Sequence, residues 1–341
     1  MSAIGSHRRD DLDRAKGLAI VLVVFGHLVA REGPAGVGWY EPLRQAVYLF
    51  HMPFFLFLSG YAAGLSGAAD AREWRELARR LAGRLLIPFA AFGLLILAGK
   101  LALGGALAVD NMPASAWAGL RALVWDTGNS PATSVWYLLA LFVFSVATPV
   151  IRSRGGLNAL LGVAALLYLL PAPQLLYLDR VCGYFLFFAV GALAAHRQSA
   201  WDAAVDRWRW PVSASLVVVL CLAGSGAWPF AGVPAKAWLL VAGLAAMPAL
   251  HGVCRAWTSS RLLWLGQRAF PVYLLNTICI GLAKAALIPV LGWDAAYFPL
   301  VAAALMAAGL LGPLALAGVA RVTVARAGGW FPARPASVGS R

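Results

Sequence analysis

Residues 17–30 read GLAIVLVVFGHLVA, an apolar run that contains a single ionisable side chain, His27. Lys16 stands directly before this run, eleven residues ahead of the histidine. At about 1.5 Å of rise per helical residue, eleven residues place His27 about 16 Å beyond Lys16. That distance is about half of the roughly 30 Å hydrocarbon thickness of a bilayer, so we expect His27 near the middle of the membrane.

A histidine at that depth has two interpretations. An ionisable group there costs on the order of several kcal/mol unless something satisfies it, which favours a functional role. The alternative is a core histidine that is hydrogen-bonded to a neighbouring helix. Three of the other four histidines are expected at cytoplasmic helix ends as ordinary interfacial residues: His7, His196 and His251.

The chain as a whole is apolar. Of its 341 residues, 61% are hydrophobic and 12% are charged, and its mean hydropathy is +0.76. A soluble protein carries about 25% charged residues. The apolar runs have the length of helices rather than of barrel strands, so we predict an all-α integral membrane protein.

The net charge of +14 does not indicate a nucleic-acid partner. The arginines lie between apolar runs, where a membrane protein retains them, and are not interleaved with aromatic residues. The four cysteines occur singly in or beside apolar stretches, and no His or Cys cluster has the spacing of metal ligands. We therefore expect no nucleic-acid partner and no metal site.

About ten transmembrane helices fit the apolar runs. They form one domain, residues 1–327, and we expect the tail at residues 328–341 to be disordered. No small-residue cleavage signal follows the first run, which predicts a retained helix rather than a signal peptide. The predicted helices cover residues 12–30, 46–65, 85–103, 133–151, 156–172, 180–196, 211–226, 235–254, 269–291 and 297–320.

The basic residues predict the orientation. With the N-terminus in the cytoplasm, 21 of the 28 Lys and Arg lie on the cytoplasmic side, 6 lie on the outer side and one, Lys284, lies inside a helix. Basic residues are enriched in cytoplasmic loops, so both termini are predicted to be cytoplasmic. The arginine-rich residues 70–84 fit a surface helix on anionic lipid. They also fit a site for the phosphates of a cytosolic ligand, formed by Arg79, Arg80 and Arg84.

A second histidine is expected at the depth of His27. The predicted second helix opens with FHMPFFLFLSGY at residues 50–61 and enters from the outer face, so His51 lies a turn or two below that face. Histidine, with a pKa of about 6.5, is suited to take a proton from a hydroxyl group that attacks a thioester. Such an attack also needs donors for the developing oxyanion. The candidate donors are His51, Trp136, Tyr137 and Tyr61, and Asn276 is another polar residue in an apolar run.

Two other stretches each have two interpretations. Ser59 has the chemistry of an acyl-enzyme nucleophile, but the Ser59-Gly60 step is also typical of close helix packing. The long outer connection, residues 104–132, combines polar and aromatic residues, which suits a sugar-like ligand and equally an interfacial belt.

Several motifs resemble the acyltransferase 3 family of membrane acyltransferases. The run from Asp13-x-x-Lys16-Gly17 to Gly26-His27 is similar to that family's basic residue, ten spacers and histidine, and FHMPFFLFLSGY is similar to its second-helix signature. In combination these two motifs particularly resemble the fucose 4-O-acetylase-like branch. Weaker resemblances lie at Arg79-Arg80 with RLLIPF at 84–89, at Val135-Trp136-Tyr137-Leu138, and at Leu265-Gly266 followed by Tyr273.

The resemblance implies an acyl-CoA donor, usually acetyl-CoA, and a hydroxyl acceptor on a sugar or glycan. It implies that His27 is the catalytic base, with Lys16 standing where the family usually has arginine and Asp13 beside it. It also implies an enzyme of the cytoplasmic (inner) membrane of a bacterium. Asn276 stands where a histidine is expected, so a role for this position does not carry over.

Two other classes of protein remain as alternatives. In a proton-coupled transporter or flippase, the buried histidines would relay protons. Such proteins often show repeated halves or paired broken helices, which are not evident in this sequence. The third class is a membrane scaffold without catalysis.

Overall fold

The computed structural model describes residues 9–29, 33–70, 72–103, 112–224 and 233–328. Within these ranges the regular secondary structure is helical, apart from two isolated bridges, Ala35–Asp294 and Asp126–Leu175. The prediction of an all-helical chain is therefore confirmed. The α-helices are α1 (Asp10–Gly26), α2 (Tyr40–Tyr48), α3 (His51–Leu65), α4 (Trp74–Leu81), α5 (Ile87–Leu103), α6 (Ala116–Val124), α7 (Trp136–Leu169), α8 (Leu178–His196), α9 (Gln198–Gly224), α10 (Val233–Ala256), α11 (Ser260–Gly266), α12 (Ala269–Leu291) and α13 (Phe298–Gly328).

In the described residues, seven helices are long and apolar enough to cross a membrane. This supports a membrane protein, whereas the predicted number of ten and the cytoplasmic termini stay predictions. Helix α1 is not one of the seven, since its 17 residues extend about 25 Å. The seven are Tyr40–Leu65, Trp74–Ala102, Trp136–Leu169, Leu178–His196, Ala235–Ala256, Ala269–Leu291 and Phe298–Val319.

Helix α7 contains a kink at Gly156. A straight helix of its 34 residues would extend about 51 Å, well beyond a bilayer core. The backbone leaves the helical region at Gly156, whose φ of 66° is readily adopted only by glycine. This break falls at the boundary between the predicted helices 133–151 and 156–172.

The arginine-rich segment differs from its prediction as a separate surface helix. Helix α4 continues through a π-helical turn, Ala82–Leu86, directly into α5. Leu77 and Leu85 are both buried, so the apolar stripe of the membrane helix already begins in α4. The predicted start at residue 85 is therefore wrong by about three turns.

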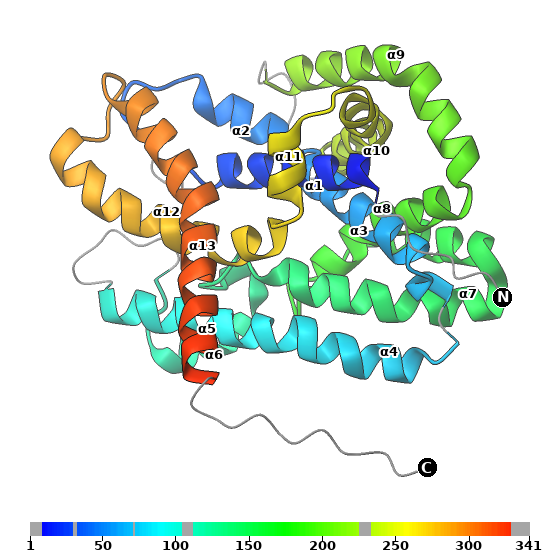
Figure 1. Ribbon diagram of the computed structural model, residues 1–341, viewed down its shortest axis with the longest axis horizontal. Coiled ribbons are helices and arrows are strands. Elements are labelled where there is room, and N and C mark those ends of the chain that lie inside the picture. The colour runs from blue at the N-terminus through cyan, green and yellow to red at the C-terminus, as the bar shows by residue number, and fades with distance from the viewer. Residues whose placement is uncertain (1–8, 30–32, 71, 104–111, 225–232, 329–341) are drawn as a thin grey trace, which may run out of the picture.

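Helices α3 and α8 form the centre of the molecule. They cross so closely at Gly60 and Gly191 that a Cβ atom at either position would collide with the backbone of the other helix. This confirms the packing interpretation of the Ser59-Gly60 step. In Figure 1, α4, α5 and α6 lie below these helices with α7, and α9 and α10 lie above them.

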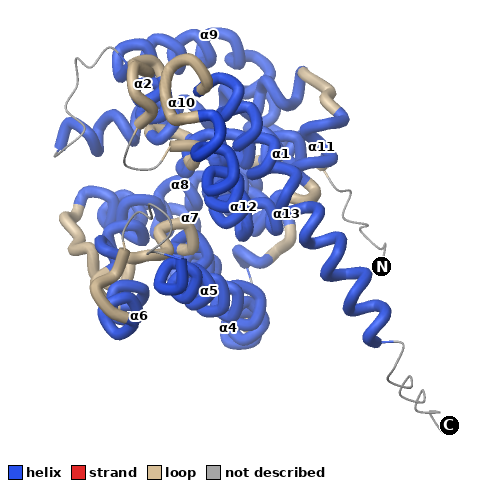
Figure 2. Tube along the Cα trace, turned by 90° about the vertical axis from the view of Figure 1, so that its left-hand side faces the viewer, coloured by secondary structure: helices blue, strands red, loops and turns tan. Residues whose placement is uncertain are grey.

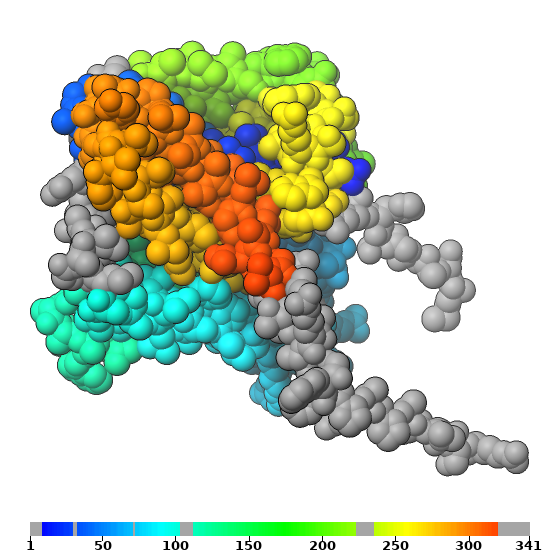
Figure 3. Space-filling view, turned by 60° about the vertical axis from the view of Figure 1, so that its left-hand side comes forward, coloured from blue at the N-terminus to red at the C-terminus, as the bar shows by residue number. Residues whose placement is uncertain are grey.

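Helix α1 runs through the upper half of the molecule and positions the candidate site. It packs against α11, where Gly17 and Gly266 leave no room for a Cβ atom. Viewed at right angles to Figure 1, α4, α5 and α12 are seen nearly end-on (Figure 2). The α12–α13 pair lies across one face, between α11 and the α4–α5 helix (Figure 3).

Candidate active site

His27 lies at the C-terminal end of α1, as its capping residue. Two tyrosines of α2 secure this end, because Tyr40 Oη donates to Phe25 O at 2.6 Å and Tyr48 Oη donates to Gly26 O at 2.7 Å. Both carbonyl groups belong to the last turn of the helix, where the regular backbone hydrogen bonds of the helix end. Part of the His27 surface stays accessible, and no hydrogen-bond partner of its ring is found in the described part of the chain. Its ring nitrogens are therefore not engaged by the residues that the structure describes.

His51 lies beside this end of α1. Its ring packs on the Tyr48 ring at a centroid distance of 4.9 Å, and it lies within range of an electrostatic interaction with His27. Both histidines therefore lie near the same end of α1, while their shared depth in a membrane stays a prediction. His51 Nδ1 lies 2.9 Å from Val47 O and must donate to it, because a carbonyl only accepts.

That bond fixes what His51 can do. In the neutral ring the remaining nitrogen, Nε2, then carries a lone pair and accepts hydrogen bonds. A donor role toward an oxyanion, as the sequence suggested, requires a protonated His51 ring. The neutral ring is instead suited to orient a hydroxyl group.

Two positive side chains approach the same end of α1. Arg44 makes a two-pronged ion pair with Glu41 at 2.6 and 2.8 Å, and its guanidinium lies 4.9 Å from the centre of the Tyr48 ring. Lys284 of α12 lies 5.5 Å from the centre of the Trp293 ring. Both cations act electrostatically on His27. The sequence prediction missed these two residues, although a lysine inside a predicted helix was the available signal.

Lys16 and Asp13 lie in the other half of α1. Lys16 Nζ is 3.2 Å from Asp13 Oδ1, and the Asp13 side chain is buried. The helix holds this pair about 16 Å from His27. The structure therefore separates the four residues predicted to be catalytic into two pairs.

The predicted substrate residues are likewise divided. Tyr137 of α7 is buried against the middle of α3, and its hydroxyl lies 2.7 Å from Ser59 Oγ. Trp136 borders a small cavity of about 50 Å³ beside Asp179 and Arg180. Tyr61 lies at the far end of α3, where its hydroxyl accepts a hydrogen bond from Arg9 at 2.9 Å. Tyr61 is thus placed away from the histidines.

Asn276 and the predicted phosphate-binding arginines have contrasting surroundings. Asn276 is fully buried, and its Nδ2 donates to the carbonyls of Val272 and Tyr273 within α12. Its Oδ1 has no partner in the described residues. The side chains of Arg79, Arg80 and Arg84, by contrast, are exposed on one long helix.

An ionic network at the start of α1 was missed by the sequence prediction. Asp11 accepts hydrogen bonds from Arg9, Arg255 and His251, and Arg9 and Arg255 also pair with Asp202. His251 is fully buried, which corrects its expected place among the interfacial residues. Burial disfavours the Asp11 carboxylate, yet the hydrogen bonds from His251 and Arg9 outweigh it and hold its pKa well below the usual value.

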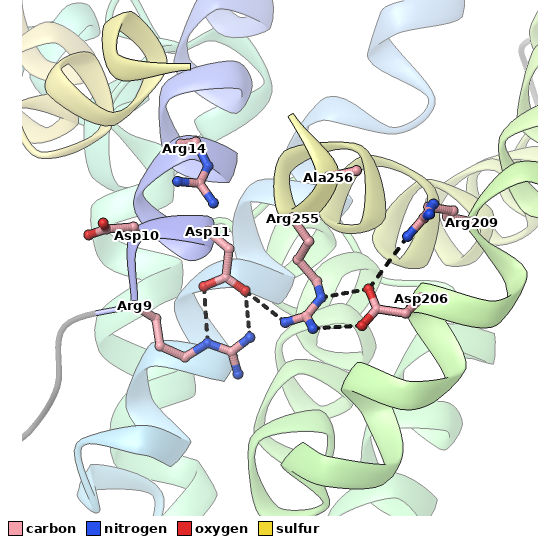
Figure 4. Close-up of a pocket in the computed structure, with 8 residues that line it drawn as sticks. All are labelled: Arg9, Asp10, Asp11, Arg14, Asp206, Arg209, Arg255 and Ala256. Carbon is pink, nitrogen blue, oxygen red and sulfur yellow. Dashed lines mark hydrogen bonds and ion pairs between the residues drawn. The ribbon is translucent and has the colours of Figure 1, made fainter. Parts of the chain in front are cut away.

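The network borders an open cavity of about 740 Å³, which we call the arginine cavity (Figure 4). It lies at the opposite end of α1 from His27. The sequence shows basic residues here, but the positive-inside rule explains them without a site. The lining residues are Arg9, Asp10, Asp11, Arg14, Asp206, Arg209, Arg255 and Ala256.

Comparison with known proteins identifies the family. The chain is 26% identical over 228 residues to nodulation protein NolL of Mesorhizobium japonicum, covering 65% of this chain and 58% of that protein. It is 29% identical over 195 residues to nodulation protein NolL of Sinorhizobium fredii, covering 56% of this chain and 50% of that protein. The chain thus spans just over half the length of these relatives, and no solved structure matches it. The acyltransferase domain model of the acyltransferase 3 family matches residues 9–318, so the chain belongs to that family of membrane acyltransferases.

Proposed function

We propose that this acyltransferase transfers an acyl group, most simply acetyl, from acyl-CoA to a hydroxyl group of a sugar or glycan. The observation that carries the proposal is the partly exposed His27 at the end of α1, near His51 and within electrostatic range of two cations. This combination offers a base, an orienting group and positive charge where a tetrahedral intermediate would form.

In the proposed reaction, His27 takes the proton of the acceptor hydroxyl as its oxygen attacks the thioester carbonyl. The neutral His51 ring accepts a hydrogen bond from a second, neighbouring hydroxyl of the sugar and so orients the acceptor. The positive charges of Arg44 and Lys284 stabilise the oxyanion. The carbon–sulfur bond then breaks, and the thiolate of CoA receives the proton from the His27 imidazolium. No metal takes part in this scheme.

The donor is proposed to approach from the face at which α1 begins, and the acceptor from the face at which α1 ends. The exposed arginines of the α4–α5 helix, Arg79, Arg80 and Arg84, suit the phosphates of CoA. Lys16 and Asp13 lie between that face and His27. The polar and aromatic residues around Trp136 suit a sugar. We place the enzyme in the cytoplasmic membrane of a bacterium, with both termini in the cytoplasm.

The test is acyl transfer by the purified protein. Incubation with radiolabelled acetyl-CoA and a panel of sugars and glycans is expected to give a labelled O-acetyl product. His27→Ala is expected to lower the rate by a factor of about 10² to 10⁴, the usual contribution of a general base, without changing the thermal unfolding temperature. Full activity of His27→Ala, or sugar uptake into vesicles without consumption of acetyl-CoA, would contradict the proposal.

A further inference from the structure

The arginine cavity combines fixed arginines with arginines that still have donors to offer. Arg255 is held by Asp206 in a two-pronged pair at 2.8 and 3.0 Å, and it also reaches Asp11 at 3.2 Å. Arg9 is held by Asp11 and Asp202. These ion pairs hold two guanidinium groups in place at the cavity wall, so that little rearrangement is needed when an anion arrives.

Arg14 and Arg209 keep unused donors. Arg14 Nε donates to Cys254 O at 2.8 Å, and the described residues provide no partner for its two terminal nitrogens. Arg209 Nε is buried without a hydrogen-bond partner in the same part of the chain, and its Nη1 lies a loose 3.9 Å from Asp206. A buried donor without a partner is uncommon in a folded protein and costs free energy. These donors therefore indicate a missing acceptor.

The packing of α9 on α10 brings Arg209 to the cavity. Gly252 of α10 lies against Arg209 and Val205, and a Cβ atom at this position would come within 2.8 Å of Arg209 Cβ. In Figure 4, Arg14 and Arg209 approach from opposite sides of Arg255, and Asp10 points away from them. Helix α1 also begins here, so its positive dipole end faces the same space.

We propose that the arginine cavity binds the phosphate groups of the acyl donor's nucleotide, an inference that rests on the proposed function. Guanidinium groups bind phosphate through two parallel hydrogen bonds, which suits the forked donors of Arg14 and Arg209. The volume of about 740 Å³ is in the range of small-molecule sites. The cavity adds a second set of partners to the exposed arginines of the α4–α5 helix.

The test compares two donors of different length. Acetyl-CoA carries the nucleotide phosphates, whereas S-acetylpantetheine has the same thioester and lacks them. Arg209→Gln and Arg14→Gln are each expected to raise the KM for acetyl-CoA by about tenfold or more, because hydrogen bonds between charged groups are lost. Their kcat and their KM for S-acetylpantetheine are expected to stay within about twofold of the wild type, a margin below the roughly fivefold change of one weak hydrogen bond.

Arg207→Gln is the matched control, since Arg207 lies on the same helix, contacts Trp208 and does not line the cavity. An equal rise in KM for both donors would show a structural effect and overturn the inference. So would an unchanged KM for acetyl-CoA in both cavity variants. Loss of bound phosphatidylglycerol in these variants, with an unchanged KM for acetyl-CoA, would assign the cavity to a lipid headgroup instead. If the wild type consumes neither donor, the proposed function itself is wrong, which is a different result.

Discussion

A histidine lies at each end of α1, and the two histidines differ in their hydrogen-bond partners. At the end with His27, the surroundings are mainly aromatic, and the histidine ring has no hydrogen-bond partner among the described residues. At the end with Asp11, the carboxylate is shared by Arg9, Arg255 and His251, and His251 is bonded through both ring nitrogens. A histidine with free nitrogens is suited to react, whereas one with both nitrogens engaged is suited to hold a structure.

The tautomer of His251 follows from its partners. The Trp201 indole donates to Nδ1 at 2.9 Å, so the neutral ring carries its hydrogen on Nε2 and donates to Asp11 at 3.1 Å. The difference between the two ends teaches that burial alone does not identify a functional histidine in this fold. A better criterion for a candidate functional histidine is whether its ring nitrogens have hydrogen-bond partners within the protein.

Exchanging each histidine for glutamine tests this comparison most strongly. His27→Gln is expected to lower kcat by a factor of about 10² to 10⁴ with an unchanged free energy of unfolding. His251→Gln is expected to lose about 1–3 kcal/mol of stability because buried partners are left unsatisfied, while each folded molecule keeps its activity. Acyl-transfer rates and thermal unfolding of both variants measure the two effects. The comparison fails if His251→Gln is as inactive as His27→Gln while remaining folded.

Removing the shared carboxylate has the next largest effect. Asp11→Asn leaves Arg9 and Arg255 partly unpaired in a largely buried place, which is expected to cost about 3 kcal/mol. Because the pKa of Asp11 is lowered on folding, its stabilisation is complete above about pH 4 and is lost as the pH falls below that value. The thermal unfolding temperature of the wild type is therefore expected to fall as the pH is lowered below about 4. The informative control is Asp11→Asn, in which this part of the decline should be missing.

Residues at the His27 end of α1 were singled out from the sequence, whereas the ionic network at the other end was overlooked. His27, His51 and Gly60 stand out because each interrupts an apolar run, and local motifs such as FHMPFF are contiguous. The network around Asp11 pairs residues at the start of α1 with residues of α9 and α10 that lie 193 to 244 positions further along the chain. No local pattern reports such a pairing. The positive-inside rule already explains the basic residues near the arginine cavity, so nothing in the sequence was a reason to expect a cavity there.

Tyr61 and Asn276 show a second limit of the sequence. Both are polar residues in apolar helices and were grouped with the substrate residues for that reason. Tyr61 instead bonds Arg9 at the ionic end, because α3 carries it ten residues beyond His51, about 15 Å along the helix. Asn276 Nδ2 donates to carbonyls of its own helix, and its buried Oδ1 has no partner among the described residues. Spacing predicts a position along a helix, but the neighbours at that position depend on which helices pack together.

The two tyrosines that bond the end of α1, Tyr40 and Tyr48, provide a finer test of the surroundings of His27. Tyr48→Phe removes the bond to Gly26 but keeps the ring that packs on His51, so kcat is expected to fall by roughly threefold to tenfold, about the effect of one hydrogen bond. Tyr40→Phe removes the equivalent bond to Phe25. The ring of Tyr40 packs on Phe298 and not on His51. Its kcat is expected to stay near the wild-type value. Equal losses of activity in the two variants would show that the bonds only hold the helix end.

The smallest expected effect concerns Lys16, which lies between the two ends. The Lys16 side chain is 31% exposed in its ion pair with Asp13, so Lys16→Gln is expected to cost less than about 1 kcal/mol of stability. About 16 Å separates it from His27, too far for proton transfer, so kcat should change little. A rise in the KM for acetyl-CoA, on the order of threefold, is expected because one positive charge on the donor's path is lost. Lys16→Arg keeps that charge and should restore the wild-type KM. If kcat fell while KM stayed constant, Lys16 would belong with the reactive end, and the boundary between the two ends would move toward the start of α1.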